Sequence, residues 1–198
     1  MKNDRPLLDS YTLIEQVLRN RQPIIKKGGY RQAAVAMILR TGTTGLEMFF
    51  IERARHENDP WSGQIAFPGG GYEPEDNIVL HTALRETREE VGLALSPAML
   101  IGRLDDQITS NHRERGEHAL VISCFVFHLS EDQPVSQNYE VSANFWVPIA
   151  HLFDPRHVFT YYPRNPNRPF PGIRFEGGQV LWGLTYRFVE QLDRLLCH

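Results

Sequence analysis

Three glutamates, Glu86, Glu89 and Glu90, lie within little more than one helical turn of the segment "ALRETREEVGL" at residues 83–93. On a helix, which turns about 100° per residue, these carboxylates share one lateral strip. Oxygen ligands of this kind suit Mg²⁺ or Mn²⁺, which keep other positions open for water and phosphate oxygens. The alternative is a solvated face on which Arg85 and Arg88 pair with the glutamates. Because carboxylates repel one another and are disfavoured near a helix C-terminus, we expect a positive partner here.

Three consecutive glycines, Gly69, Gly70 and Gly71, precede this acidic segment. Glycine allows the backbone to approach a metal or a diphosphate closely and to adopt unusual dihedral angles. The glycines alone would be compatible with an ordinary turn between a strand and a helix. Their fixed spacing from the glutamates favours a functional site.

The elements that must position these residues can be read from apolar spacing. Leu80, Ala83, Leu84, Thr87 and Val91 recur at steps of three and four. This pattern predicts a helix that starts near Asp76, packs this face on a sheet and leaves through a left-handed residue at Gly92.

The rest of the chain mixes strand and helix patterns. Apolar runs at residues 32–40 and 46–54 predict a hairpin around the turn "TGTTG", and further strands are expected in 98–104, 118–129, 143–149 and 172–177. Helices are expected at about 8–20 and about 179–197. The proline-rich segment 154–171 predicts an extended loop. The order of elements indicates one domain over residues 1–198, with an α+β fold or a layered α/β sandwich around a mixed sheet.

Composition excludes several classes of function. A net charge of −3 and a pI near 6.2 argue against a bulk nucleic acid partner. Two cysteines supply neither a disulfide framework nor a sulfur-based zinc site, so a cytoplasmic location is expected. No signal peptide and no membrane-spanning run are apparent, so no membrane partner is expected.

Residues 71–93, "GYEPEDNIVLHTALRETREEVGL", resemble the Nudix box, the signature of hydrolases that cut nucleoside diphosphates linked to another moiety. The matching positions are Gly71, Arg85, Glu86, Glu89, Glu90, Gly92 and Leu93. The sequence departs from the signature at Asn77, where a glutamate is usual, and at Thr87, where an aliphatic residue is usual. Asp76 or Glu75 could replace the missing carboxylate. The resemblance implies an α/β/α sandwich with a mixed β-sheet.

A second motif narrows the resemblance. Gly63, Phe67, Pro68, Gly69 and Gly70 look like the element carried by Nudix enzymes that hydrolyse coenzyme A, although the spacing upstream of Gly63 differs from the usual one. The segment "GGQVLWGLTYRFVEQL" is also similar to that subfamily. The implied reaction splits coenzyme A into 3',5'-ADP and 4'-phosphopantetheine. Rival substrates are ADP-ribose, dinucleoside polyphosphates and oxidised nucleotides, and a nucleotide-binding module without hydrolysis is an alternative of another class.

The resemblance also implies roles for individual residues. The expected ligands of Mg²⁺ or Mn²⁺ are Glu86, Glu89, Glu90 and the carbonyl of Gly70. Glu89 counts as catalytic, and Arg85 is expected to orient the carboxylates. Glu140 is the candidate general base, with an exposed loop acid as the alternative.

Groups that could contact the substrate are spread over the chain. Arg53 or Arg55 could bind a phosphate, including a 3'-phosphate, because guanidinium binds phosphate through two parallel hydrogen bonds. Tyr161 and Tyr162 could stack on adenine, and His112 and His118 lie in a polar loop that could cover the cleft. The residues expected to bind substrate are Arg53, Arg55, Phe67, Gly69 and Gly70. The expected partner is a small-molecule nucleotide, and a homodimer is a candidate assembly.

Overall fold

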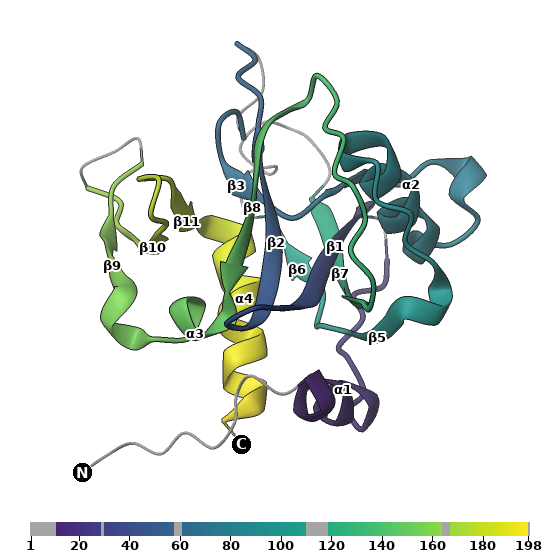
Figure 1. Cartoon of the computed structure of the whole chain (residues 1–198). Helices are drawn as coiled ribbons and strands as arrows, with labels where there is room; N and C mark the ends of the chain where they lie inside the picture. Colours follow the sequence, from purple (N-terminus) through teal and green to yellow (C-terminus); the bar gives the residue numbers. More distant parts are fainter. Residues whose placement is uncertain (1–10, 29, 58–60, 110–118, 164–166, 198) are drawn as a thin grey trace.

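The computed structural model describes residues 11–28, 30–57, 61–109, 119–163 and 167–197. A sheet of eight strands forms the centre (Figure 1). Its strands are β1 Arg31–Gly42, β2 Gly45–Arg53, β3 Ile65–Ala66, β4 Gly69–Gly71, β5 Leu100–Arg103, β6 Gln107–Ile108, β7 Leu120–Leu129 and β8 Val141–Pro148. A second sheet holds β9 Val158–Tyr161, β10 Phe170–Arg174 and β11 Val180–Trp182. The helices are α1 Tyr11–Arg19, α2 Val79–Val91, α3 Ile149–Leu152 and α4 Gly183–Leu196, and 3₁₀ turns occupy Pro74–Asp76, Pro97–Met99 and Pro155–His157.

The central sheet is mixed because one pair of its strands is parallel. β1 runs parallel to β7, while β2, β4 and the remaining partners pair in antiparallel fashion. β1 and β2 form the predicted hairpin, with Gly42 opposite Gly45. β4, which contains the three glycines, pairs with the start of β1 and places Gly70 opposite Ala34.

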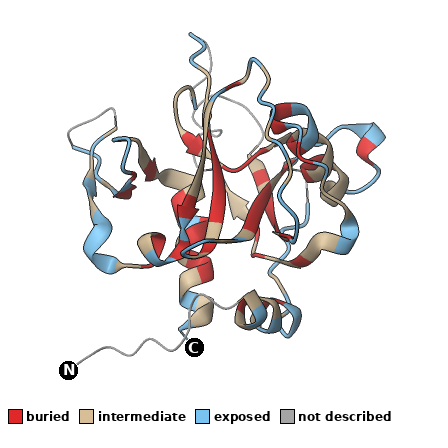
Figure 2. Ribbon diagram, in the orientation of Figure 1, coloured by how far each residue is buried: buried red, intermediate tan, exposed pale blue. Residues whose placement is uncertain are grey.

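Two apolar layers lie on opposite faces of the central sheet. Alternate residues of a strand point to opposite faces, so Phe49 and Ile51 of β2 pack with α2, whereas Met48 and Phe50 pack on the side of α4 and the second sheet. Figure 2 shows the buried residues concentrated in the central strands. The predicted α/β/α sandwich with a mixed sheet is confirmed.

Several observed boundaries differ by a few residues from the predicted ones. α2 begins at Val79 rather than near Asp76, because Asn77 has a positive φ of 59° that no α-helix tolerates. α4 begins at Gly183 rather than 179, because residues 180–182 pair with β10. The segment expected to be an extended loop contains β9, which pairs with β10. In the first helix, residues 8–10 lie outside the described part.

The buried face of α2 is rotated from the predicted one. Thr82, Ala83, Thr87, Glu90 and Val91 are buried, whereas Leu80 and Leu84 are only partly buried. The helix therefore turns one carboxylate of the acidic strip into the protein. Gly92 ends the helix in the left-handed conformation with φ 72°, as its position predicts.

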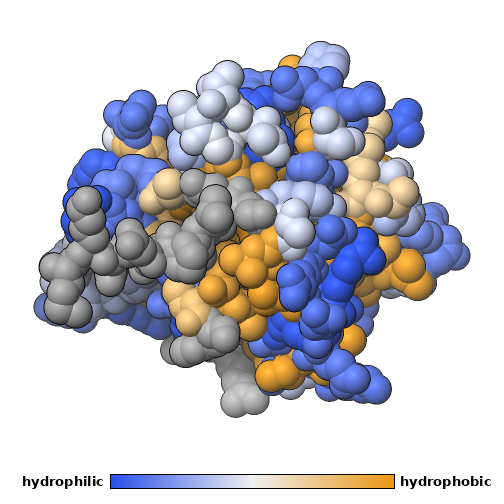
Figure 3. Space-filling view, turned by 60° about the horizontal axis from the view of Figure 1, so that its bottom comes forward, coloured by the Kyte–Doolittle hydropathy of each residue, from blue (hydrophilic) through white to orange (hydrophobic). Residues whose placement is uncertain are grey.

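Some apolar residues remain on the surface. Figure 3 shows a group of them near the centre of the face that lies towards the bottom of Figure 1. In the part of the chain that the structure describes, no helix combines the length and apolar character needed to cross a bilayer.

Candidate active site

The glycines of β4 bring the backbone against the acidic strip of α2. Gly69 has φ 155°, and a Cβ there would overlap the Ala34 carbonyl and Val35 of the neighbouring strand. A Cβ at Gly70 would overlap the carboxylate of Glu86. The glycines therefore allow two close approaches, one to β1 and one to α2.

Glu90 is the buried member of the strip, with 2% of its surface exposed. Its carboxylate accepts a hydrogen bond of 2.9 Å from the Gly69 N–H. The pKa of Glu90 is raised to about 7, chiefly by burial; the Gly69 N–H and the charge of Arg53 lower it, and the negative charges of Glu86 and Glu140 add to the rise. Glu90 is thus an acid that the fold holds in an environment unfavourable to its charge.

Glu86 lies beside it, with 14% of its side chain exposed. Burial raises its pKa, Arg85 lowers it, and the charges of Glu89 and Glu140 raise it. Burial, together with the neighbouring carboxylates, therefore disfavours the negative charge of both side chains, and a bound cation would offset that cost.

Arg85 is the positive partner that the crowded carboxylates required. Its guanidinium forms ion pairs with Asp76 at 2.8 Å, Glu86 at 2.9 Å and Glu89 at 3.1 Å. It also donates a hydrogen bond of 3.0 Å to the Gly71 carbonyl. Arg85 therefore links β4, the turn before α2 and the acidic strip, as expected of an orienting residue. The side chain of Glu89 is 56% exposed and lies against this arginine.

Asp76 precedes residue 77, where the signature has a glutamate, and forms the buried contacts at this turn. Its buried carboxylate binds Arg85 and accepts hydrogen bonds from the Thr82 hydroxyl at 2.8 Å and the Glu73 N–H at 3.0 Å. The Arg85 guanidinium holds the pKa of Asp76 well below its usual range. Asn77 is exposed. The sequence offered either Asp76 or Glu75 as the replacement carboxylate. It did not predict the role of Thr82, for which the only indication is a position six residues after Asp76.

Glu140 lies directly before β8, as predicted, and its backbone is fixed on two sides. Its N–H donates to the Asn138 side chain at 2.8 Å, and its carbonyl accepts from Ala54 at 2.7 Å. The Asn138 N–H in turn donates to the Glu90 carbonyl at 2.9 Å. The structure therefore brings Glu140 to the acidic strip, where its charge raises the pKa of Glu86 and Glu90. Asn138 was not predicted.

The two predicted phosphate-binding arginines serve different regions. Arg53, the last residue of β2, lies near enough to Glu90 for its charge to lower the pKa of that carboxyl. Arg55, beyond the end of β2, lines a pocket of about 320 Å³ on the other side of the sheet. We call this the β11 pocket; its main lining side chains are Glu52, Arg55, Tyr161, Gln179 and Trp182.

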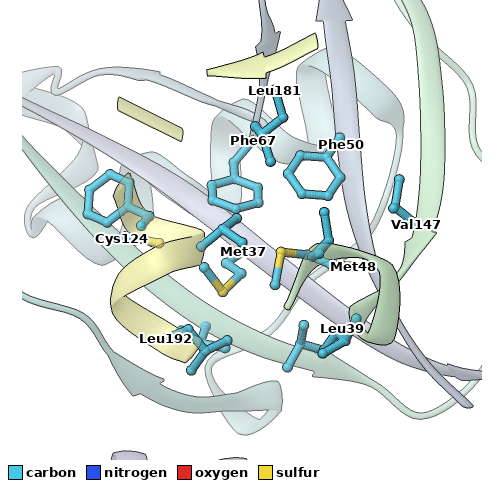
Figure 4. Packing of buried hydrophobic residues seen from close by; sticks show 14 of the residues in the cluster. Met37, Leu39, Met48, Phe50, Phe67, Cys124, Val147, Leu181 and Leu192 are labelled. Atoms are coloured by element: carbon cyan, nitrogen blue, oxygen red, sulfur yellow. The ribbon is translucent and has the colours of Figure 1, made fainter. Parts of the chain in front are cut away.

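Other predicted contacts are placed elsewhere. Phe67, predicted to bind substrate, is 3% exposed and stacks on Phe50 in the core, with ring centroids 5.1 Å apart (Figure 4), and its contact with substrate stays a prediction. Gly69 holds Glu90 through its N–H. Tyr161 lines the β11 pocket, whereas Tyr162 is exposed outside that lining. His112 and His118 lie outside the described residues.

The acidic strip fits a hard divalent cation by donor chemistry, since carboxylate and backbone oxygens are what Mg²⁺ and Mn²⁺ prefer. Within the described ranges, no three histidine, cysteine or acidic side chains already converge as a metal-binding group. The ion pair between Glu89 and Arg85 is one reason, because it directs this carboxylate toward the guanidinium. The assignment of Glu86, Glu89, Glu90 and the Gly70 carbonyl as metal ligands stays a prediction.

Comparison with known proteins agrees with this arrangement. The NUDIX domain family matches residues 30–181. NudL of Escherichia fergusonii, an uncharacterised Nudix hydrolase, is 31% identical over 93% of this chain and 92% of its own. The human mitochondrial coenzyme A diphosphatase NUDT8 is 31% identical over 68% of this chain and 56% of its own. A MutT/Nudix protein from Enterococcus faecalis shares the fold, with a TM-score of 0.59 at 15% identity over 95% of this chain and 70% of its own. The chain therefore belongs to the NUDIX family and is a Nudix hydrolase, an enzyme that cleaves diphosphates.

Proposed function

We propose that this enzyme hydrolyses coenzyme A or its derivatives at the diphosphate, giving 3',5'-ADP and 4'-phosphopantetheine. The observation that carries the proposal is the end of β2, where the charge of Arg53 acts on Glu90 of the acidic strip and Arg55 lines the β11 pocket. A diphosphate carrying a further phosphate needs cationic groups at two separated places, and arginine is suited to both. The similarity to the human coenzyme A diphosphatase supports the same substrate.

The chain's own residues have distinct tasks in this reaction. Glu86, Glu89, Glu90 and the Gly70 carbonyl would hold the divalent cation that the family generally uses, and we propose Mg²⁺ or Mn²⁺. When bound, such an ion neutralises phosphate charge and lowers the pKa of a coordinated water. Arg85 positions the carboxylates through its ion pairs. Glu140 is the candidate to accept the proton of the attacking water. One water is consumed and the bridging P–O bond breaks, so each product keeps one phosphate of the diphosphate, and 3',5'-ADP also keeps the 3'-phosphate.

Two further assignments belong to the proposal. Both cysteines are free thiols, Cys124 buried and Cys197 exposed, in accord with a reducing cytoplasmic location. The bound partner would be a small nucleotide, and the homodimer stays a prediction.

A substrate panel tests the proposed reaction. The purified protein is incubated in millimolar Mg²⁺ or Mn²⁺ with coenzyme A, ADP-ribose, a dinucleoside polyphosphate and an oxidised nucleoside triphosphate, and the products are identified by mass spectrometry. We expect 3',5'-ADP and 4'-phosphopantetheine from coenzyme A, at the highest kcat/KM of the panel. Efficient cleavage of ADP-ribose with no cleavage of coenzyme A would overturn the proposal. Nucleotide affinity without any cleavage would instead indicate a binding module.

Removal of divalent ions is expected to abolish hydrolysis and to leave the fold intact. The two apolar layers and the Asp76–Arg85 pair do not depend on a cation, whereas binding of a ligand to the native state alone adds only RT ln(1 + [L]/Kd) to stability. Circular dichroism in chelator should therefore show the native spectrum, and restored Mg²⁺ should raise Tm by a few degrees. A large loss of helical signal in chelator would contradict this expectation.

A further inference from the structure

The β11 pocket has a chemical character different from that of the acidic strip. Arg55 supplies a cation, Glu52 an anion, and Tyr161 and Trp182 two aromatic rings whose centroids are 5.8 Å apart. The Gln179 side chain adds an amide whose Oε1 is buried and, among the described residues, has no hydrogen-bond partner. Such a set can hold a flat polar ring and an anion at the same time.

The backbone that carries Arg55 is well anchored. The Arg53 N–H donates to the Gln64 carbonyl at 3.0 Å, and the Gly63 N–H donates to the Arg53 carbonyl at 3.1 Å. One residue beyond Arg55, the His56 N–H donates to the Ser62 hydroxyl at 2.6 Å. These bonds close the base of the loop between β2 and β3, so the backbone at Arg55 is held in place.

The pocket and the acidic strip are immediate neighbours across the sheet. Glu52 lines the pocket, whereas Arg53 acts on Glu90 on the opposite face. Glu52 and Arg53 are consecutive residues with Cα atoms about 3.8 Å apart, so the two regions share the end of β2. A molecule whose diphosphate lies at the acidic strip can therefore extend around the end of β2 into the pocket.

We propose that the β11 pocket binds the adenosine 3'-phosphate half of the substrate, with the base against Trp182 and the 3'-phosphate at Arg55. The inference rests on the proposed function, since it assigns one half of that substrate to this place. The pantetheine half fits less well, because it is a flexible amide chain with neither an aromatic ring nor a charge beyond its terminal phosphate. The carboxylate of Glu52 keeps a phosphate away from its own end of the pocket and is available to an amino or hydroxyl group.

Binding of the separate products tests the assignment without relying on catalysis. Titration calorimetry in Mg²⁺ measures Kd for 3',5'-ADP, 5'-AMP and 4'-phosphopantetheine. Arg55→Ala is expected to raise the Kd of 3',5'-ADP by about tenfold or more, the loss typical of one charge-assisted hydrogen bond. The Kd values of 5'-AMP and 4'-phosphopantetheine should not change. Trp182→Ala is expected to weaken 3',5'-ADP and 5'-AMP alike and to spare 4'-phosphopantetheine. Arg187→Ala, an exposed arginine on α4, is the matched control.

Two results would overturn the proposal. Weaker binding of 4'-phosphopantetheine with unchanged binding of 3',5'-ADP would place the pantetheine half in the pocket, and unchanged binding of all three products would leave the pocket without a role in binding. If Trp182→Ala lowers Tm strongly, Trp182→Phe keeps a ring for packing and should retain most of the 3',5'-ADP affinity. The expected binding pattern together with an absence of coenzyme A cleavage would refute the proposed reaction while the nucleotide subsite stands.

Discussion

Glu90→Gln is expected to lower kcat/KM by at least about a hundredfold and, at the same time, to stabilise the metal-free protein. Mutation of a residue that only hydrogen-bonds to a metal ligand already lowers metal affinity or activity by about 10–100-fold. Glu90 is a candidate ligand itself, so a larger loss is expected. The stability gain follows from the raised pKa of about 7 in the buried carboxylate. A raised carboxyl pKa favours the folded state below about pH 4, and this contribution is lost as pH rises through 7. The neutral amide avoids the loss and keeps an oxygen for the Gly69 N–H.

The stability gain of Glu90→Gln is measured by denaturant unfolding in chelator at pH 5 and pH 8. The variant should exceed the wild type by about 1–3 kcal/mol at pH 8, and the difference should shrink towards pH 5. Glu89→Gln is the informative comparison: its side chain is exposed, so activity should fall without a stability gain. Glu131→Gln, on the surface, is the control for both measurements. Turnover close to that of the wild type in both Glu89→Gln and Glu90→Gln would refute the ligand assignment.

Gly69→Ala is expected to destabilise the fold by roughly 3 kcal/mol or more, which combines a forbidden dihedral angle with a backbone overlap. The new Cβ would overlap the Ala34 carbonyl, and both atoms belong to paired strands that cannot separate without breaking the ladder. The free energy of unfolding by urea and the soluble yield report the effect.

The neighbouring glycines provide the matched series. A Cβ at Gly71 meets nothing within 4 Å, so Gly71→Ala should change stability by no more than about 0.5 kcal/mol. Gly70→Ala should fold, because the atoms that it meets belong to the movable Glu86 side chain, but it should lose activity as this carboxylate is displaced. Equal stabilities for the Gly69 and Gly71 variants would show that the close approach of β4 to β1 is not required.

Local patterns predicted the elements whose signals are long or chemically specific. The β1–β2 hairpin, the helix bearing Glu86, Glu89 and Glu90, and the position of Glu140 before a strand all followed from short stretches of sequence. The spacing of the Nudix signature was less reliable at a single residue. It places a carboxylate at position 77, whereas Asn77 has a positive φ and the carboxylate of the preceding residue, Asp76, contacts Arg85.

Features that depend on distant contacts could not be derived in this way. The motif containing Phe67 gives no information on which side chain enters the core, and packing against Phe50 decided that question. The strands β9 and β11 have only four and three residues, so their pairing with β10 defines them more than their composition does. The β11 pocket joins residue 55 to residues 177–182, which no local pattern connects.

The alternating direction of side chains at the end of β2 determines which sequence changes can give this enzyme a new substrate preference. Glu52 lines the β11 pocket, whereas Arg53 acts on the acidic strip of α2. The pairing of β2 with β8 shifts register between these two residues. Substitutions at Arg55, Gln179 or Trp182 can therefore alter the accepted moiety while the carboxylates of α2 keep their places. An insertion of one residue before Glu52 would instead exchange the two faces, because side-chain direction alternates along a strand. New substrate preferences should thus arise by point substitution around the pocket, while length changes should be confined to the loop between β2 and β3.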